Sequence, residues 1–293
     1  MTMPNFLIIG APRSGTTSLH RYIQEHPQIF MSEVKELRFF ALEGKQLNFC
    51  GPCDRTVNRQ SITNLENYQE QFKGVTNEKA IGESSPIYLW WEGVPERIKS
   101  YLPNAKLISI FRNPIERAYS DFLNMRQLGW EPLKDFAEAL KEEENRIKAG
   151  WGPFYYYQRK GFYYSNLERF YHVFPKEQIR LYLYEDLFSN LPNLLQDIFR
   201  FLEVDDGFLP DIKQVYNASN RIPKTFLGKA ANKLTKYSFT KPLYPVLEWV
   251  KKQQSTSPPL PLDIKKKLVE TYRGDILKLQ ENIGRDLSGW LKV

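Results

Sequence analysis

Short, mainly apolar runs alternate with amphipathic segments through the first two thirds of the chain. Five runs are expected to form strands: 6–9, 29–31, 80–83, 105–111 and 179–184, of which 6–9 and 105–111 have the character of strands buried in a parallel sheet. The segments between them place apolar residues at helical spacing, which predicts helices over 16–26, 65–72, 95–102, 114–128, 132–150, 164–174 and 193–202, with a last helix over 262–282. Residues 45–74 are otherwise expected to be irregular.

Strands that alternate with helices predict an α/β fold, in which a central, mainly parallel sheet is flanked by helices. The first strand leads into a glycine-rich turn, so we expect a P-loop-like three-layer arrangement. No linker rich in Pro, Gly or Ser and no internal repeat divides the pattern. The expected organisation is therefore a single domain over residues 1–293.

Composition places the chain among soluble globular proteins, with 42% hydrophobic and 26% charged residues. No stretch approaches the ~20 apolar residues of a membrane span, and no leader pattern opens the sequence, so we expect a cytoplasmic protein. The net charge of +7 favours anionic ligands. Lysines and arginines are spread along the chain without a nucleic-acid-binding motif, so no nucleic-acid partner is expected.

The turn after the first strand has the layout of a phosphate-binding loop. Its glycines let the backbone curl around an anion, toward which backbone N–H groups and the positive end of the next helix point. A nucleotide triphosphatase has lysine after the second glycine, where this chain has Thr16 and carries its charge at Arg13 instead. A structural turn is the alternative, but a cation inside the turn favours an anion site formed by Arg13, Ser14, Gly15, Thr16, Thr17 and Ser18.

A second anion-binding pair is expected after the strand 105–111. Arg112 follows this strand, and Ser120 lies about two turns into the helix that Pro114 opens. A guanidinium fork and a hydroxyl together suit a phosphate monoester. An ordinary salt bridge is the alternative for an arginine at this position.

Two glutamates also lie at the carboxyl ends of predicted strands: Glu36 follows 29–31 after a short turn, and Glu83 is the last residue of 80–83. Ligands of open parallel sheets bind beyond the carboxyl ends of the strands, so both carboxylates are expected near the two arginines. The alternative for Glu36 is an ion pair with Lys35 or Arg38.

The chain contains two cysteines, in Cys50-Gly51-Pro52-Cys53, which has the letters of a thioredoxin-type redox site. The surrounding Asn, Asp and Gly residues indicate a loop, whereas a redox motif belongs near the start of a helix. One C-x-x-C also supplies only half of a zinc site. We therefore expect a surface loop with reduced thiols.

Two separate motifs, APRSGTTSL at 11–19 and FRNPIERAYSDF at 111–122, resemble the cofactor-binding segments of sulfotransferases that use 3′-phosphoadenosine 5′-phosphosulfate (PAPS). KELRFF at 35–40 is similar to the segment of heparan-type and related bacterial sulfotransferases in which an acidic residue precedes two phenylalanines. GFY at 161–163 and DLSGWL at 286–291 resemble the G-x-Y segment and the carboxyl end of that group. The resemblance spans nearly the whole chain.

The resemblance implies transfer of the sulfuryl group from PAPS to a hydroxyl or an amine of a carbohydrate or small natural product. By that analogy the loop holds the 5′-phosphosulfate, Arg112 with Ser120 holds the 3′-phosphate, and no metal is needed. Glu36 is then the general base, and Arg13 stabilises the leaving phosphate. His20, His26 and His172 are the alternative bases.

The resemblance adds further residues to the predicted site. Tyr163 of the G-x-Y segment is expected at the donor, and a basic loop closes over the 3′-phosphate, formed by Arg221 and Lys224 or, alternatively, by residues 159–161. Aromatic rings stack on sugar faces or planar molecules, so the aromatic residues of this chain are candidates for acceptor contacts. Packing in the core is the alternative role for these residues. The residues expected at the acceptor are Glu83, Tyr88, Trp90, Phe154 and Tyr156.

The sequence departs from the heparan-type pattern at two points. Arg13 stands where many members carry lysine, so contact with the phosphosulfate should persist. No lysine follows Glu83, so a sulfated polysaccharide is implied less strongly as the acceptor. Two other functions remain as alternatives. One is a nucleotide kinase or triphosphatase that uses the acidic end of the strand in 180–186 to hold magnesium, and the other is a non-catalytic nucleotide-binding module.

Overall fold

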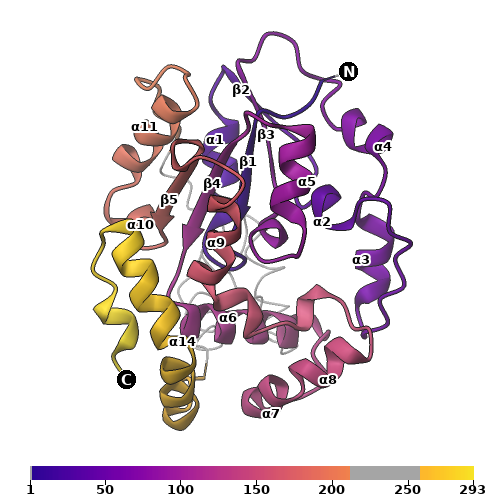
Figure 1. Ribbon diagram of the computed structural model, residues 1–293, viewed down its shortest axis with the longest axis vertical. Helices are drawn as coiled ribbons and strands as arrows, with labels where there is room; N and C mark the ends of the chain where they lie inside the picture. Colours follow the sequence, from indigo (N-terminus) through magenta and orange to yellow (C-terminus); the bar gives the residue numbers. More distant parts are fainter. Residues whose placement is uncertain (1, 212–257) are drawn as a thin grey trace, which may run out of the picture.

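The computed structural model describes residues 2–211 and 258–293, and within them five strands form one parallel sheet (Figure 1). The order across the sheet is β2-β3-β1-β4-β5, and all four neighbouring pairs are parallel. The strands are β1 (Phe6–Gly10), β2 (Ile29–Met31), β3 (Ala80–Ser84), β4 (Lys106–Phe111) and β5 (Ile179–Leu183). All five predicted strands are confirmed, with small changes at their ends.

The apolar character of the central strands follows from burial on both faces. In β1, Phe6 and Ile8 join one hydrophobic cluster, whereas Leu7 and Ile9 join another on the opposite face. Successive side chains of a strand point to opposite faces, so a strand covered on both sides must be apolar at every position. Helices α1 (Thr16–Gln24), α10 (Asp186–Ser189) and α11 (Leu191–Phe201) cover one face, and α5 (Val94–Tyr101), α6 (Pro114–Leu128), α9 (Tyr163–Tyr171) and α14 (Leu262–Ile283) cover the other. The predicted three-layer α/β fold is confirmed.

The helices vary widely in length, from four to 22 residues. They are α1 (Thr16–Gln24), α2 (Phe39–Leu42), α3 (Asp54–Gln60), α4 (Leu65–Glu70), α5 (Val94–Tyr101), α6 (Pro114–Leu128), α7 (Phe136–Lys141), α8 (Glu143–Lys148), α9 (Tyr163–Tyr171), α10 (Asp186–Ser189), α11 (Leu191–Phe201) and α14 (Leu262–Ile283). Short 3-10 helices are η1 (Pro86–Leu89), η2 (Pro153–Tyr155), η3 (Arg159–Gly161), η4 (Lys176–Gln178) and η6 (Ser288–Leu291).

The prediction of one helix over 132–150 is wrong, because the structure has two short helices there. Asp135 caps α7 by accepting a hydrogen bond from the backbone N–H of Glu138 (3.0 Å), so the helix begins only after it. At the start of α8, the buried Glu143 carboxylate accepts the backbone N–H groups of Gln158 and Arg159 (2.6 and 3.0 Å). This tertiary contact accompanies the break between the two helices. The expected irregular segment 45–74 also contains α3, which was not predicted.

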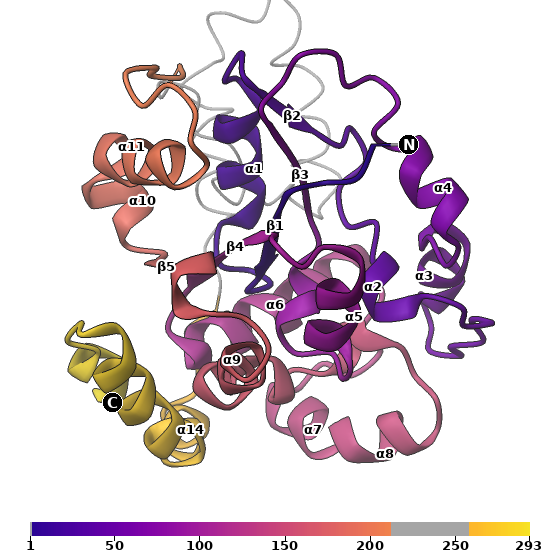
Figure 2. The ribbon, with the colours of Figure 1, turned by 45° about the horizontal axis from the view of Figure 1, so that its top comes forward.

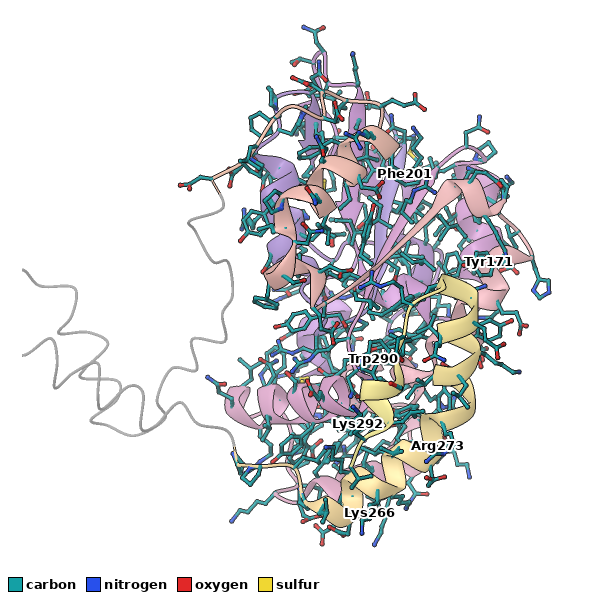
Figure 3. The ribbon with its side chains drawn as sticks, turned by 90° about the vertical axis from the view of Figure 1, so that its left-hand side faces the viewer. Tyr171, Phe201, Lys266, Arg273, Trp290 and Lys292 are labelled. Carbon is teal, nitrogen blue, oxygen red and sulfur yellow. The ribbon has the colours of Figure 1, made fainter. Side chains whose placement is uncertain are left out.

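The carboxyl-terminal segment packs on the same core as the sheet. Helix α14 lies beside α9 (Figure 2), and its Asp275 accepts hydrogen bonds from the backbone N–H groups of Tyr164 and Ser165 (2.9 Å each) at the start of α9. Trp290 points into the body of the protein from the chain end (Figure 3), and its indole N–H donates to Glu185 (3.3 Å). The described carboxyl-terminal residues therefore share one core with the sheet, and a single domain over all of 1–293 stays a prediction.

Candidate functional site

The sheet order places the two predicted anion-binding segments next to each other. Strands β1 and β4 are neighbours, and the backbone N–H of Ala11, just beyond β1, donates to the carbonyl of Ile110 in β4 (2.8 Å). Both strands point the same way, so Arg13 and Arg112 leave the same edge of the sheet. This edge is the carboxyl end of the strands, where open parallel sheets bind ligands.

The loop between β1 and α1 is tightly built. Gly15 has a φ of +90°, and a Cβ at this position would lie 2.4 Å from Cδ1 of Leu187. Only glycine combines this left-handed conformation with so close a neighbour. Helix α1 starts at Thr16 without a side-chain cap, which leaves its first N–H groups directed at the space above the loop. These donors and the positive helix end suit an anion.

The arginines and hydroxyls beside the loop form a connected group. The Nη2 atom of Arg13 lies 3.5 Å from Oγ of Ser120, which it reaches from the other segment. Arg112 pairs with Glu116 one helical turn away (3.1 Å), and its guanidinium lies over the ring of Tyr184, 4.9 Å from the centroid. Glu116 is well exposed, so this ion pair is weak and leaves Arg112 available to a stronger anion.

Backbone contacts to β3 hold Glu36 in the loop between β2 and α2. The backbone N–H of Glu36 donates to the carbonyl of Ser84 (2.9 Å), and that of Arg38 donates to Oγ of Ser85 (3.1 Å). Glu36 and Arg38 have φ values of +64° and +60°, and Arg13 has +62°. This region is costly for residues other than glycine, and such strain is frequent at functional sites. Among the described residues, only Glu203 is a further non-glycine residue with positive φ.

Two cations hold the carboxylate of Glu36. Arg38 Nη2 lies 2.8 Å from Oε2, and Lys35 Nζ lies 3.4 Å from Oε1. Burial by itself raises the pKa of Glu36, but the charges of Lys35 and Arg38 outweigh it and lower the pKa to about 2. Both alternatives considered for this residue are therefore present at once: Glu36 faces the candidate site and also forms the ion pairs.

These elements enclose a cavity of about 800 Å³ at the carboxyl edge of the sheet. Of the predicted residues, those that line it are Arg13, Gly15, Thr16, Thr17, Ser18, Glu36, Trp90, Arg112, Ser120 and Phe154. Loop, arginines, candidate base and two aromatic rings thus share one cavity. Its size falls in the range of small-molecule sites.

Five other predicted residues lie behind the cavity wall. Glu83, Tyr88 and Tyr156 are buried and do not line it, because the carboxylate of Glu83 is turned toward the hydroxyls of Ser85 and Tyr68 (2.8 and 3.4 Å) and the rings pack in the core. The cavity therefore gives no support for direct contact between an acceptor and these three residues. Ser14 and Tyr163 are also buried behind the lining. Arg221 and Lys224 lie outside the described residues.

Sequence reasoning missed a buried ionic group at the cavity. Lys160, considered only as part of the alternative basic loop, donates to Asp121 (2.8 Å) and to the carbonyl of Phe154 (3.2 Å). Asp121 also pairs with the fully buried Arg117 (3.4 Å). Burial lowers the pKa of Lys160. The position of Asp121, directly after Ser120 in the motif, could have marked it as a site residue. Its contact with Lys160 could not be predicted, because the two residues are distant in the sequence. Lys35 and Tyr184 also line the cavity.

None of the three histidines considered as alternative bases lines the cavity. His20 and His26 are buried outside the cavity lining, and burial together with the charges of Lys35 and Arg21 lowers the pKa of His20 to about 3. His26 is engaged through both ring nitrogens, with the carbonyl of Asp205 (2.8 Å) and the backbone N–H of Gln28 (3.0 Å). His172 lies at the end of α9 and does not line the cavity either.

The expectation for the cysteines is partly wrong. Both thiols are free and Cys50 is exposed, but Cys53 is buried and stands at the start of helix α3 rather than in a surface loop. Its sulfur accepts a hydrogen bond from the hydroxyl of Tyr155 (3.3 Å). Burial raises the pKa of the Cys53 thiol, the opposite of what a reactive redox cysteine needs.

Comparison with known proteins agrees with this geometry. A family model described as the sulfotransferase domain matches residues 3–220. The membrane-associated sulfotransferase kil1 of Dictyostelium discoideum is 34% identical over 122 residues, which are 42% of this chain and 23% of that protein. Human carbohydrate sulfotransferase 15 is 25% identical over 252 residues, 69% of this chain and 44% of that protein. The chain thus spans less than half the length of these relatives.

Solved structures extend the similarity to the whole chain. The crystal structure of a sulfotransferase from Alicyclobacillus acidocaldarius superposes with a TM-score of 0.80 at 29% identity and covers 100% of both chains. A sulfotransferase domain from the curacin biosynthetic pathway has the same fold, with a TM-score of 0.51 at 18% identity. Among the described residues, no helix is long and apolar enough to cross a membrane. The family match over most of the chain, together with the loop, arginine and glutamate gathered at one cavity, shows that this chain belongs to the sulfotransferase domain family.

Proposed function

We propose that the chain is a sulfotransferase that carries the sulfuryl group of PAPS to a hydroxyl or an amine of a small natural product or carbohydrate. The observation that supports it most is the shared cavity, in which Arg13, Arg112 and Glu36 meet although they come from three different loops. PAPS is the donor that sulfotransferases of this family use. An anion site, a base and room for an acceptor are what this reaction requires.

The residues present fit the donor. Arg13, the hydroxyls of the loop and the first N–H groups of α1 would hold the 5′-phosphosulfate, because they are charged or polar donors around one loop. Arg112 and Ser120 would hold the 3′-phosphate. Tyr184, Leu187 and Phe188 line the cavity beside Arg112 and offer aromatic and apolar surface to an adenine ring.

Other residues that line the cavity suit the acceptor. Trp90, Trp130, Phe154 and Met125 line it with apolar surface, and Lys160 and Asp121 add charged groups. We therefore propose Trp90 and Phe154, which line the cavity, as acceptor contacts. Rings of this kind stack on sugar faces and on planar small molecules alike.

The proposed reaction is a single displacement at sulfur, in which Glu36 receives the proton of the acceptor. When bound, PAPS supplies an electrophilic sulfur and a phosphate leaving group. Glu36 accepts the proton of the acceptor O–H as the new S–O bond forms, and the product adenosine bisphosphate departs with the electron pair of the broken bond. Arg13 and the loop N–H groups stabilise the negative charge that grows on the departing phosphate oxygen.

Calorimetry and a transfer assay test this proposal together. The wild-type protein should bind adenosine 3′,5′-bisphosphate, and Glu36→Gln should keep this binding while transfer from labelled PAPS is lost. An acceptor screen should cover sugars, lipids, phenols and alkaloid-type amines. Absence of bisphosphate binding in the wild-type protein would contradict the proposal, and an unimpaired rate in Glu36→Gln would remove Glu36 as base.

The kinase alternative has little support in the geometry. Asp186, the acidic residue after β5 that would have to hold magnesium, pairs with Arg285 (2.9 Å) and accepts the backbone N–H of Leu183 (3.0 Å). EDTA should therefore leave transfer unchanged, whereas a kinase would lose activity. Binding of the bisphosphate without transfer to any acceptor would instead favour a non-catalytic module. The cytoplasm is the compartment we propose, and imaging of the tagged protein in its host tests it.

A further inference from the structure

Lys35 lies between the phosphate-binding loop and the candidate base. Its Nζ atom is 3.5 Å from Oγ1 of Thr16, at the start of α1, and 3.4 Å from Oε1 of Glu36. Both distances are at the long end of the hydrogen-bond range, so the ammonium is centred on neither partner. The side chain lines the cavity and is 20% exposed. A small movement would bring it fully onto an anion in the loop.

The charged and titratable groups around this ammonium come from three elements. Glu36 is on its own loop, and the charge of Lys35 also acts on the buried His20 of α1 and on Glu83 of β3, whose carboxylate is turned toward Ser85 and Tyr68. His20 is neutral, because burial and the nearby cations keep its pKa low. Arg38 holds the other oxygen of Glu36 at 2.8 Å and is tied to Ser85 through its backbone. Lys35 is thus the cation that the loop and Glu36 share.

This sharing creates a conflict for catalysis. A carboxylate held by two cations binds a proton poorly, whereas a general base needs proton affinity. A bound phosphosulfate carries more negative charge than one carboxylate and would lie against Thr16. It therefore attracts the ammonium more strongly than Glu36 does, since the Coulomb attraction scales with charge.

We infer that Lys35 is a positioning residue for which Glu36 and the bound donor compete: when the loop is occupied, the ammonium turns from Glu36 to the anion and frees Oε1 of the carboxylate to accept a proton, while Arg38 stays on Oε2. This inference rests on the proposed function, because it assumes that the donor's phosphosulfate binds at the loop. It makes the base ready only after the donor has bound, which favours donor binding before proton transfer from the acceptor.

A double-mutant cycle on the affinity for adenosine 3′,5′-bisphosphate tests the competition without any activity measurement. Glu36→Gln removes the competitor, so the bisphosphate should bind about tenfold more tightly than to the wild-type protein. In the Lys35→Met background the same Glu36→Gln change should alter the affinity less than about twofold. Lys35→Met alone should weaken binding of the bisphosphate about tenfold. In the Lys35→Arg background, Glu36→Gln should still strengthen binding by most of the factor seen in the wild-type background.

The cycle separates the competition from simple repulsion between Glu36 and the ligand. Repulsion through space does not need Lys35, so an equal gain from Glu36→Gln in both backgrounds would overturn the inference. No binding in any variant would instead overturn the proposed function. The matched control is the surface pair Lys73 and Glu70, joined at 2.9 Å with Lys73 77% exposed. Lys73→Met and Glu70→Gln should leave the affinity unchanged, and circular dichroism should show that every variant is folded.

Discussion

Arg13 Nη2 lies 3.5 Å from Ser120 Oγ, although 107 residues separate the two in the sequence. The contact joins the loop after β1 to helix α6 after β4, because these strands are neighbours in the sheet. Two anion-binding segments that the sequence shows only separately therefore form one continuous surface. A ligand with phosphates at both ends would span this surface, and each segment can be tested on its own.

Arg13→Ala should weaken the binding of adenosine 3′,5′-bisphosphate about 10- to 100-fold. It removes a charge-assisted hydrogen bond worth about 1.5–3 kcal/mol. Arg13→Lys keeps the charge without the planar fork, so its affinity for the bisphosphate should lie between those of the wild-type protein and Arg13→Ala. Isothermal calorimetry measures the change. Arg21→Ala is the control, because Arg21 is an exposed arginine of α1 that donates to Gln24; an equal loss there would point to general electrostatics.

Arg112→Ala should reduce the same affinity by a similar factor, since we place Arg112 at the 3′-phosphate. The loss should be much smaller for adenosine 5′-monophosphate, which lacks that group. Arg273→Ala provides the matched control, because Arg273 (Figure 3) also pairs with a glutamate on its helix, Glu270 at 2.6 Å, but lies on α14 away from the cavity lining. If both ligands lost affinity equally, Arg112 would have no special relation to the 3′-phosphate.

Gly15→Ala should destabilise the protein by about 2–4 kcal/mol, because it adds a clash with Leu187 to the cost of the left-handed backbone. Gly44→Ala separates the two effects. Gly44 has a φ of +66°, and a Cβ added there would meet nothing within 4 Å, so only the backbone cost of about 1 kcal/mol applies. Urea unfolding measures both variants. Equal losses would show that the close approach to Leu187 carries no cost.

The titration of Glu83 should lower the free energy of unfolding as the pH rises from about 4.5 to about 7. Burial, opposed by hydrogen bonds from hydroxyls, raises the pKa of Glu83 from 4.5 to about 7. The folded state thus binds the proton more tightly than the unfolded state, and stability is lost as pH rises through this window. The loss is about 3 kcal/mol, at about 1.4 kcal/mol per pKa unit.

Glu83→Gln removes this titration. The free energy of unfolding of the variant, relative to that of the wild-type protein, should therefore be higher at pH 8 than at pH 5. Urea unfolding at both pH values measures the difference. Glu70→Gln, a change at an exposed carboxylate, is the control. A Glu83→Gln effect of the same size at both pH values would mean that the Glu83 pKa is not raised.

Local patterns in the sequence were sufficient for the fold class and for much of the candidate site. Fully apolar runs such as Phe6–Ile9 can be satisfied only in a sheet covered on both faces, so they identified the strands. Gly15, Arg13 and the hydroxyls after them indicated an anion site, because the backbone conformation and charge of a short loop are largely set by its own residues. Pro114 likewise marked the start of α6.

Only the tertiary structure decided how these pieces meet. The order of strands in the sheet brings Ser120 to Arg13. Packing of η3 against α6 places Lys160 against Asp121, and the hydroxyls of Ser85 and Tyr68 hold the Glu83 carboxylate in the core. The tertiary structure also sets Lys35 between Thr16 and Glu36, where its charge, together with that of Arg38, lowers the pKa of the Glu36 carboxylate against the effect of burial. Such contacts depend on which distant elements pack together and on the burial and charge that packing creates, and neither is encoded in the spacing of neighbouring residues.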